Sequence, residues 1–238
     1  MKKRAIFSLL SATVLSCSQS PKGNTVVKGE IEGLKQGTLY IQKLANNQLQ
    51  TVDSAVVSKT STFETSFDLD EAEVLYLTLD RGQTISEDNH ILFFAEPGKI
   101  TINTTLEHFS YDATVSGSKT HEDLKKYYIS KKQWIDRKNE LIKEQLNAAK
   151  NKNTQKSDEL HKAIINNDQR IMLNAVQYSL KNPESIASAY ITLTDVLPLS
   201  DKYLDTIYNS LRADVKKHKY AQLINEYLTH SKSDVNIR

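Results

Sequence analysis

Cys17 is the only cysteine in the chain, and its thiol is the side chain with the most distinctive chemistry. It follows basic and then apolar residues over positions 2–15. The apolar part is about half of the roughly 20 residues that a membrane-spanning helix needs, a length typical of a secretory signal. The small Ser16 directly precedes the thiol that a lipoprotein transferase would alkylate. We therefore predict a lipoprotein signal peptide at residues 1–16, lipidation of Cys17 and a polar tether over residues 17–24.

Lipidation of Cys17 would set both the location and the chemistry of the protein. Each buried methylene group contributes about 0.8 kcal/mol, so acyl chains would hold the protein on a membrane while the polypeptide stays in water. We expect a protein of the bacterial cell envelope, and Ser18 after the anchor is compatible with delivery to the outer membrane. An acylated thiol excludes a dithiol oxidoreductase, a thiol peroxidase and a cysteine-ligated zinc site. The alternative is an ordinary secreted protein in which Cys17 lies near the cleavage site by chance.

The charge of the chain gives no sign of a nucleic-acid-binding protein. The sequence has 31 basic and 29 acidic residues, and three of the basic ones, Lys2, Lys3 and Arg4, belong to the predicted leader. Removing them leaves 28 basic against 29 acidic residues, a net charge of −1. A nucleic-acid-binding surface normally shows as a basic excess. We therefore expect no nucleic-acid partner.

The histidines and their acidic neighbours do not predict a metal site. The spacing of a metalloprotease helix or a zinc finger is not found among the six histidines, which are His90, His108, His121, His161, His218 and His230. Residues 121–123, His-Glu-Asp, would splay around the start of a helix, where a solvated first turn is expected. Residues 87–90 combine two acids with a histidine in an expected loop, which is typical of an exposed hairpin tip. We predict no metal and no cofactor.

Asp53 and Ser54 form the pair that most resembles a nucleophile with a base. No Gly-x-Ser-x-Gly motif surrounds them, and both side chains can satisfy backbone groups at a strand end or bulge. Asp68, Asp70 and Glu71 fall in a turn between strands, where solvation is expected instead of general acid catalysis. We predict no catalytic residue.

Three aromatic residues, Tyr127, Tyr128 and Trp134, lie close together on an expected helix. Large aromatic side chains often anchor interfaces. Aromatic residues at helical spacing are more often buried in the core, where they pack against a neighbouring helix. The sequence leaves both interpretations open.

Residues 25–117 show mainly the period-two alternation of β-strands. At residues 27–32, for example, Val, Gly and Ile alternate with Lys and Glu. Many short runs of this kind, separated by turn residues, predict an antiparallel sheet or sandwich over residues 25–117.

Two turns in this region carry specific expectations. Gly33 and Gly37 belong to a hairpin-like turn and not to a phosphate-binding loop. Pro97 followed by Gly98 favours a type II turn, which would join residues 91–94 and 100–102 as a hairpin.

From Gly117 onward the pattern changes to the helical period. Long and apolar side chains share one stripe of a first helix, namely Leu124, Tyr127, Tyr128, Lys131, Trp134, Ile135, Lys138, Leu141, Ile142 and Leu146. After a polar break at residues 151–154, a second stripe holds Leu160, Ile164, Ile171, Ala175, Val176 and Leu180. The two helices predict a long antiparallel hairpin within a helical domain over residues 118–232.

The helix ends are predicted from capping residues. Thr120 and Asp123 have capping-box spacing at the start of the first helix. Asn182 is expected to cap a third helix with Pro183 at its first position. Ser200 is expected to cap a fourth.

A final helix over residues 220–228 and a loose polar tail over residues 233–238 complete the expected structure. The predicted fold class is α+β. An N-terminal antiparallel β-domain precedes a C-terminal helical domain with a long helical hairpin.

The order Gly-Glu-Ile-Glu-Gly-Leu at residues 29–34, Leu-Tyr-Ile at 39–41 and Val-Asp-Ser at 52–54 resembles domain of unknown function 4369. Such domains are found in envelope lipoproteins, commonly ahead of a thioredoxin-like module of the TlpA or peroxiredoxin-related kind. The stretch at residues 182–190 is similar to the helical linker that often precedes that module. This sequence ends at Arg238 without a Cys-x-x-Cys motif, so we expect the redox module to be missing.

The sequence supports three hypotheses about function. The leading one is a membrane-anchored, non-catalytic envelope lipoprotein that acts as a binding or scaffold module, accessory to redox or uptake machinery. The alternative is a hydrolase that uses carboxylates or a metal on loops of the β-domain. The third is a relic of a longer oxidoreductase that acts beside a separate thioredoxin-like partner.

Overall fold

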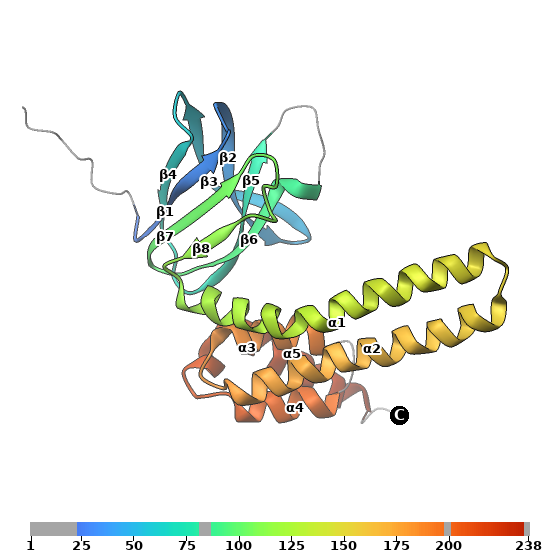
Figure 1. Cartoon of the computed structure of the whole chain (residues 1–238). Helices are drawn as coiled ribbons and strands as arrows, with labels where there is room; N and C mark the ends of the chain where they lie inside the picture. Colours follow the sequence, from blue (N-terminus) through green and yellow to red (C-terminus); the bar gives the residue numbers. More distant parts are fainter. Residues whose placement is uncertain (1–22, 81–86, 198–200, 236–238) are drawn as a thin grey trace, which may run out of the picture.

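The computed structural model describes residues 23–80, 87–197 and 201–235. Cys17, the predicted signal peptide, most of the tether and Ser200 lie outside the described residues. The first half of the chain forms a β-sandwich and the second half forms helices (Figure 1). The predicted α+β class, with strands before helices, is confirmed.

The sandwich consists of two four-stranded sheets. Sheet A has the order β4 (Thr62–Phe67), β1 (Thr25–Glu32), β7 (Gly98–Thr105) and β8 (Thr114–Ser116). Sheet B has the order β3 (Gln48–Ser58), β2 (Gln36–Ala45), β5 (Glu73–Asp80) and β6 (His90–Ala95). Pairing is antiparallel except between β1 and β7, which run parallel from Thr25↔Gly98 to Glu32↔Thr105. The sandwich is therefore mixed, where the sequence predicted it to be antiparallel.

An inner core fills the space between the sheets because alternate side chains of each strand point inward. Its fully buried members include Val27, Ile31, Leu39, Ile41, Leu75, Leu77, Phe93, Ile100, Ile102 and Phe109. Burial of one such side chain contributes about 1.5–3 kcal/mol.

Two turns join strands of different sheets, so neither forms the hairpin that the sequence predicted. Gly33, with a φ of 87°, carries the chain from β1 in sheet A to β2 in sheet B. Pro97 and Gly98 lead from β6, which pairs with β5, to β7, which pairs with β1 and β8. The predicted pairing of residues 91–94 with 100–102 is therefore wrong. Alternation shows that each strand buries one face, but both sheets face the same core, so alternation does not identify the partner strand.

The helical part begins directly after Gly117, whose φ of 92° lies in the left-handed region. Long helices α1 (Lys119–Lys150) and α2 (Thr154–Lys181) form the predicted hairpin. Figure 1 shows the far ends of α1 and α2, in yellow, projecting away from the sandwich and from the other helices. The remaining elements are α3 (Ile186–Ile191), the π-helix η2 (Thr192–Val196), α4 (Asp201–Ser210) and α5 (Lys219–Val235), with short 3-10 helices η1 (Glu87–Asn89) and η3 (Val215–Lys217).

Several helix ends differ from the predictions. The cap of α1 is Ser118, whose hydroxyl accepts a hydrogen bond from the His121 N–H, and not Thr120. Asn182 ends α2 instead of starting the next helix, and α3 begins after Ser185. These stretches hold several good cap formers in a row, so composition alone does not select one.

The last helix also differs from its prediction. It extends to Val235, beyond the predicted end at residue 228 and into the predicted loose tail at residues 233–238.

A second core joins the outer face of sheet B to the helices. Phe94 on β6 is fully buried there, with the rings of Tyr190 and Tyr220 edge-on at 5.3 and 5.9 Å between ring centroids. Leu124 and Tyr127 of α1 belong to the same core. Within the described residues, no helix combines the length and the apolar character needed to cross a bilayer.

Candidate functional site

Asp53 connects the edges of the two sheets. It lies on β3 at a β-bulge, and its carboxylate accepts hydrogen bonds from the Thr65 hydroxyl and, at 3.3 Å, from the Ser66 N–H on β4. Because β3 belongs to sheet B and β4 to sheet A, these bonds close one side of the sandwich. The neighbouring Ser54 is exposed. The carboxylate that most resembled a catalytic base is thus engaged in holding the sheets together.

Asp88 fixes a loop of the sandwich. Its carboxylate accepts hydrogen bonds from the N–H groups of Phe109 and Ser110 at 2.9 and 2.8 Å. Phe109 is fully buried in the inner core, so Asp88 positions the loop that carries this side chain. His90 has a different partner, since its Nδ1 lies 2.9 Å from the Thr78 hydroxyl.

His121 and Asp123 point to different surroundings, and Glu122 between them is exposed. The Nδ1 atom of His121 accepts a hydrogen bond from the Phe94 N–H at 3.3 Å. Burial, with a smaller effect from the nearby Lys125, lowers the pKa of His121 to about 4. Asp123 instead pairs with lysines of its own helix and accepts from the Ser185 hydroxyl at 3.0 Å. No group of three or more His, Cys, Asp or Glu side chains is arranged to hold a metal ion in the described ranges.

Tyr127 belongs to a partly buried polar cluster that the sequence did not predict. Its hydroxyl donates to the carboxylate of Asp195, and the Lys131 ammonium lies 2.7 Å from the same carboxylate. Asp195 lies in the π-helix η2, a type of element that often occurs at functional sites. Burial is the main cause that raises the pKa of Tyr127, and the bond to Asp195 adds to it. The tyrosine therefore stays protonated and serves as a donor.

The two other aromatic candidates are more exposed. Tyr128 is 44% exposed, and burial together with the nearby Asp195 raises its pKa to about 12. Trp134 is half-buried in the hairpin, with the Arg170 guanidinium 5.4 Å from its ring centroid. The three aromatic residues are thus divided between core and surface.

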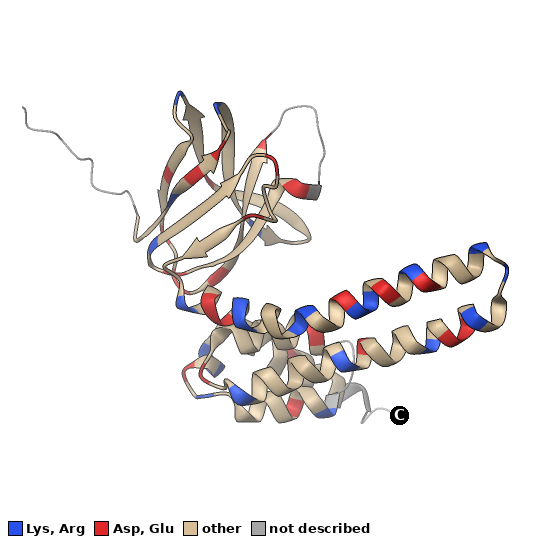
Figure 2. Cartoon of the chain, in the orientation of Figure 1, with Lys and Arg blue, Asp and Glu red and all other residues tan. Residues whose placement is uncertain are grey.

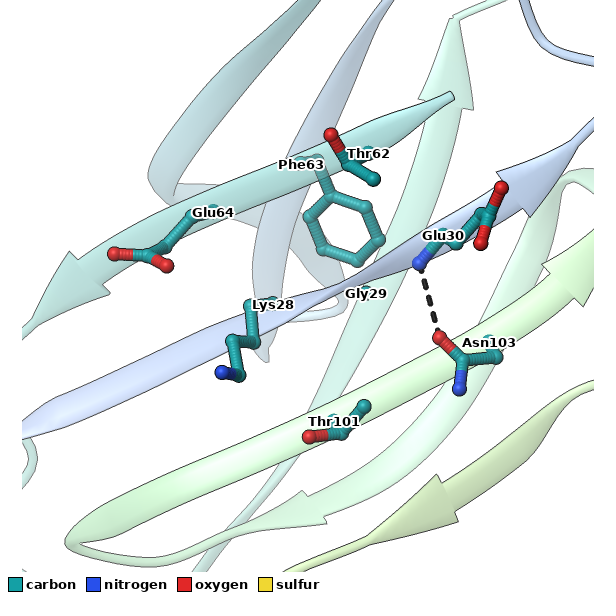
Figure 3. A pocket seen from close by; sticks show the side chains of 8 residues that line it. All are labelled: Lys28, Gly29, Glu30, Thr62, Phe63, Glu64, Thr101 and Asn103. Atoms are coloured by element: carbon teal, nitrogen blue, oxygen red, sulfur yellow. Dashed lines mark hydrogen bonds between the residues drawn. The ribbon is translucent and has the colours of Figure 1, made fainter. Parts of the chain in front are cut away.

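The outer face of sheet A carries a shallow groove of about 410 Å³ (Figure 3). Polar side chains of three strands line it, namely Lys28, Glu30, Thr62, Glu64, Thr101 and Asn103. The Asn103 amide oxygen accepts from the Glu30 N–H at 3.0 Å and so bridges β1 and β7. Lys28 and Glu64, of opposite charge, are cross-strand partners, which leaves Glu30 as the one charge of the lining without an opposite charge across from it.

A smaller pocket of about 200 Å³, here called the junction pocket, lies between the sandwich and α1. Its polar lining residues are His90, Ser110, His121, Lys125 and Tyr128, and the edge residue Leu92 of β6 also lines it. His121, Lys125 and Tyr128 lie at positions i, i+4 and i+7 of α1, which places them on one helical face. The junction pocket therefore combines donors of a helix with the edge of a strand.

A third hollow of about 250 Å³ lies where α3 and η3 meet the sandwich. His218 lines it together with Glu71, Glu184 and Asp214. The Nε2 atom of His218 lies 2.8 Å from the Ala72 carbonyl oxygen, and burial lowers the pKa of this histidine. His218 thus joins the helical part to the chain that precedes β5.

Asp195, Lys125 and Leu92 were not selected by reasoning from the sequence. Asp195 was missed because a single π-turn has no sequence signature. Leu92 was missed because the sequence does not show which strands pair and therefore which strand lies at a sheet edge. The i, i+4, i+7 spacing from His121 to Tyr128 was the one signal that pointed to Lys125.

Comparison with known families identifies the sandwich. The family model described as Domain of unknown function (DUF4369) matches residues 25–124. The matched stretch spans β1 to β8 and the start of α1, which supports a DUF4369 domain at this place in the chain. No curated protein and no solved structure matches the chain.

Proposed function

We propose that this chain, a DUF4369 domain joined to a helical part, is a lipid-anchored binding or scaffold module of the bacterial cell envelope that acts without catalysis. The leader at residues 1–16, followed directly by Cys17, supports the anchor. Ser18 after Cys17 is compatible with delivery to the outer membrane. A separate thioredoxin-like envelope protein is the partner class that the sequence resemblance suggests.

The proposal that the protein acts without catalysis is supported by the hydrogen bonds that its aspartate side chains form within the fold. Asp53, Asp88 and Asp195 each accept hydrogen bonds from residues distant in the sequence and thereby join elements of the fold. A catalytic carboxylate must instead have an oxygen within reach of the substrate. The hairpin of α1 and α2 adds a projecting surface of the kind a scaffold presents (Figure 1).

The mixed charges along the α1–α2 hairpin are better suited to binding a protein than to binding a polyanion such as a nucleic acid. Figure 2 shows Lys or Arg interspersed with Asp or Glu along both helices. Neighbouring pairs such as Lys132 with Asp136 at 2.6 Å, and Lys138 with Asp168 at 2.7 Å, neutralise one another. A single-sign basic stripe, the usual mark of a nucleic-acid surface, is not seen on the described hairpin.

The test is to follow the wild-type chain and two variants in a bacterium fed an alkyne-tagged fatty acid. The wild type and Ser18→Ala should incorporate the label and sediment with membranes. Cys17→Ser should do neither, because it lacks the thiol. Affinity purification of the labelled protein should then recover an envelope protein. Equal labelling of Cys17→Ser, or turnover of an ester, glycoside or peroxide by the purified chain at an enzyme-like rate, would reject the proposal.

A further inference from the structure

The edge of β6 leaves the main-chain groups of Leu92, a residue that lines the junction pocket, without a strand partner. Val74 on β5 and Phe94 on β6 lie opposite each other, yet the N–H of Val74 donates to the Tyr220 hydroxyl and that of Phe94 to His121. This pair therefore exchanges no ladder bonds. Because bonded and non-bonded pairs alternate along an antiparallel ladder, Leu92 likewise directs its N–H and C=O away from β5. Neither group has a hydrogen-bond partner on that side among the described residues.

Three side chains of α1 add donors to the same pocket. Since the Nδ1 of His121 accepts from Phe94, the proton of the neutral ring is on Nε2, which makes Nε2 a donor. The Lys125 ammonium forms no ion pair with any residue that the structure describes. The Tyr128 hydroxyl is protonated and 44% exposed. The pocket thus holds several donors and a positive charge.

The nearby carboxylates are already engaged. Asp195, whose charge reaches Tyr128, is paired with Lys131 and Tyr127. Asp88 accepts from the N–H groups of the loop at residues 109–110. A ligand carboxylate would therefore meet Lys125 without competition from these two carboxylates.

From these features we infer that the junction pocket binds the C-terminal carboxylate of an extended peptide, whose last residues pair with the edge of β6. The carboxylate takes the donors of Lys125, Tyr128 and His121, and the peptide main chain takes the N–H and C=O of Leu92. A donor and an acceptor on one edge residue are complementary to another strand, which is the basis of β-augmentation. A volume of about 200 Å³ is below the roughly 300–1,000 Å³ of pockets for drug-sized ligands, so it suits a chain end.

This inference rests on the proposed function in one respect, because it gives the binding module a ligand class. Its test does not depend on the lipid anchor. The full-length protein, purified in detergent micelles and immobilised, is exposed to a pool of N-acetylated heptapeptides randomised at the last three positions. The same pool with C-terminal amides serves as the comparison. Sodium succinate, a dicarboxylate without a peptide main chain, tests whether a carboxylate alone is bound.

The expected result is retention of free-carboxylate peptides at least about tenfold above their amides, since the amide forgoes the charge-assisted hydrogen bonds that a carboxylate accepts. Lys125→Glu should abolish this preference. Lys143→Glu, which changes the same charge on an exposed part of α1, should retain it. Binding should also slow hydrogen exchange at the Leu92 amide.

Equal retention of the two pools would overturn the inference. So would retention of neither pool, whether or not succinate binds. The protein could carry lipid on Cys17, show no enzymatic turnover and still retain no peptide. That result would reject the peptide ligand and leave the proposed function unaffected. An unchanged preference in Lys125→Glu would show that the carboxylate binds elsewhere and would likewise reject the site.

Discussion

Asp53 lies between two edge strands and accepts hydrogen bonds from Thr65 and Ser66. Replacing it by alanine leaves those donors without their acceptor, so Asp53→Ala should lower the free energy of unfolding by about 1–3 kcal/mol. Urea denaturation measures the change. Ser54→Ala, at the exposed neighbour, is the matched control and should stay within about 0.5 kcal/mol of wild type. The assigned role of Asp53 is wrong if both variants unfold at the wild-type midpoint.

Gly29 makes a close approach between β1 and β7 possible. A Cβ atom at this position would lie 1.6 Å from the Ile102 carbonyl oxygen, so the strands could not keep their parallel pairing. Gly29→Ala should therefore cost several kcal/mol or prevent folding, as overpacking against a rigid backbone does. At Gly37 the nearest atoms to a Cβ are flexible side chains at 3.4 and 3.5 Å. Gly37→Ala should unfold near or slightly above the wild-type temperature, and similar melting temperatures for the two variants would contradict the β1–β7 geometry.

At the scale of elements, the contact between α1 and β6 should make stability depend on pH. The pKa of His121 is about 4 in the folded state and about 6.5 unfolded, so the unfolded chain binds more protons between these values. The neutral histidine thus contributes stability above about pH 6.5 that is lost as the pH falls towards 4, roughly 3 kcal/mol in all. Urea denaturation at a series of pH values from 7 to 4.5 measures how steeply the free energy of unfolding falls with pH.

In His121→Asn the free energy of unfolding should depend less steeply on pH. Part of the dependence should persist, because burial also lowers the pKa of His218. His161→Asn, at an exposed position of α2, controls for the loss of a histidine. An identical slope in wild type and His121→Asn would refute the contribution of this contact.

The two halves of the α1–α2 hairpin should differ in stability. Near the body, α1 and α2 pack on β6, α3 and η2, whereas the far end carries exposed apolar side chains such as Leu146 at 66% and Ile165 at 46%. Regions with few buried apolar contacts open more readily. Amides at residues 135–165 should therefore exchange at least about tenfold faster than those at residues 120–131 and 170–180. Uniform protection along both helices, measured by hydrogen exchange, would indicate a partner surface or a self-contact that covers the far end.

For the whole molecule, the sequence predicted the change from strands to helices because the hydrophobic period switches at Gly117. The structure adds that this glycine has a positive φ. It also predicted the hairpin of α1 and α2 from two matching stripes. Strand partners were not predictable, since β6 and β7 each show one buried face whichever sheet they join. The junction pocket was missed for the same reason. His121 acts on Phe94, 27 positions away, and the unpaired edge at Leu92 exists only once β5 and β6 pair.

We propose that the DUF4369 domain and the helical part are held at the envelope by a lipid on Cys17. The most direct measurement is the intact mass of the protein extracted from bacterial membranes, with fragmentation of its N-terminus. We expect a mature chain that starts at Cys17 and carries acyl chains. A chain with an unmodified Cys17 thiol, recovered from the water-soluble fraction, would contradict it.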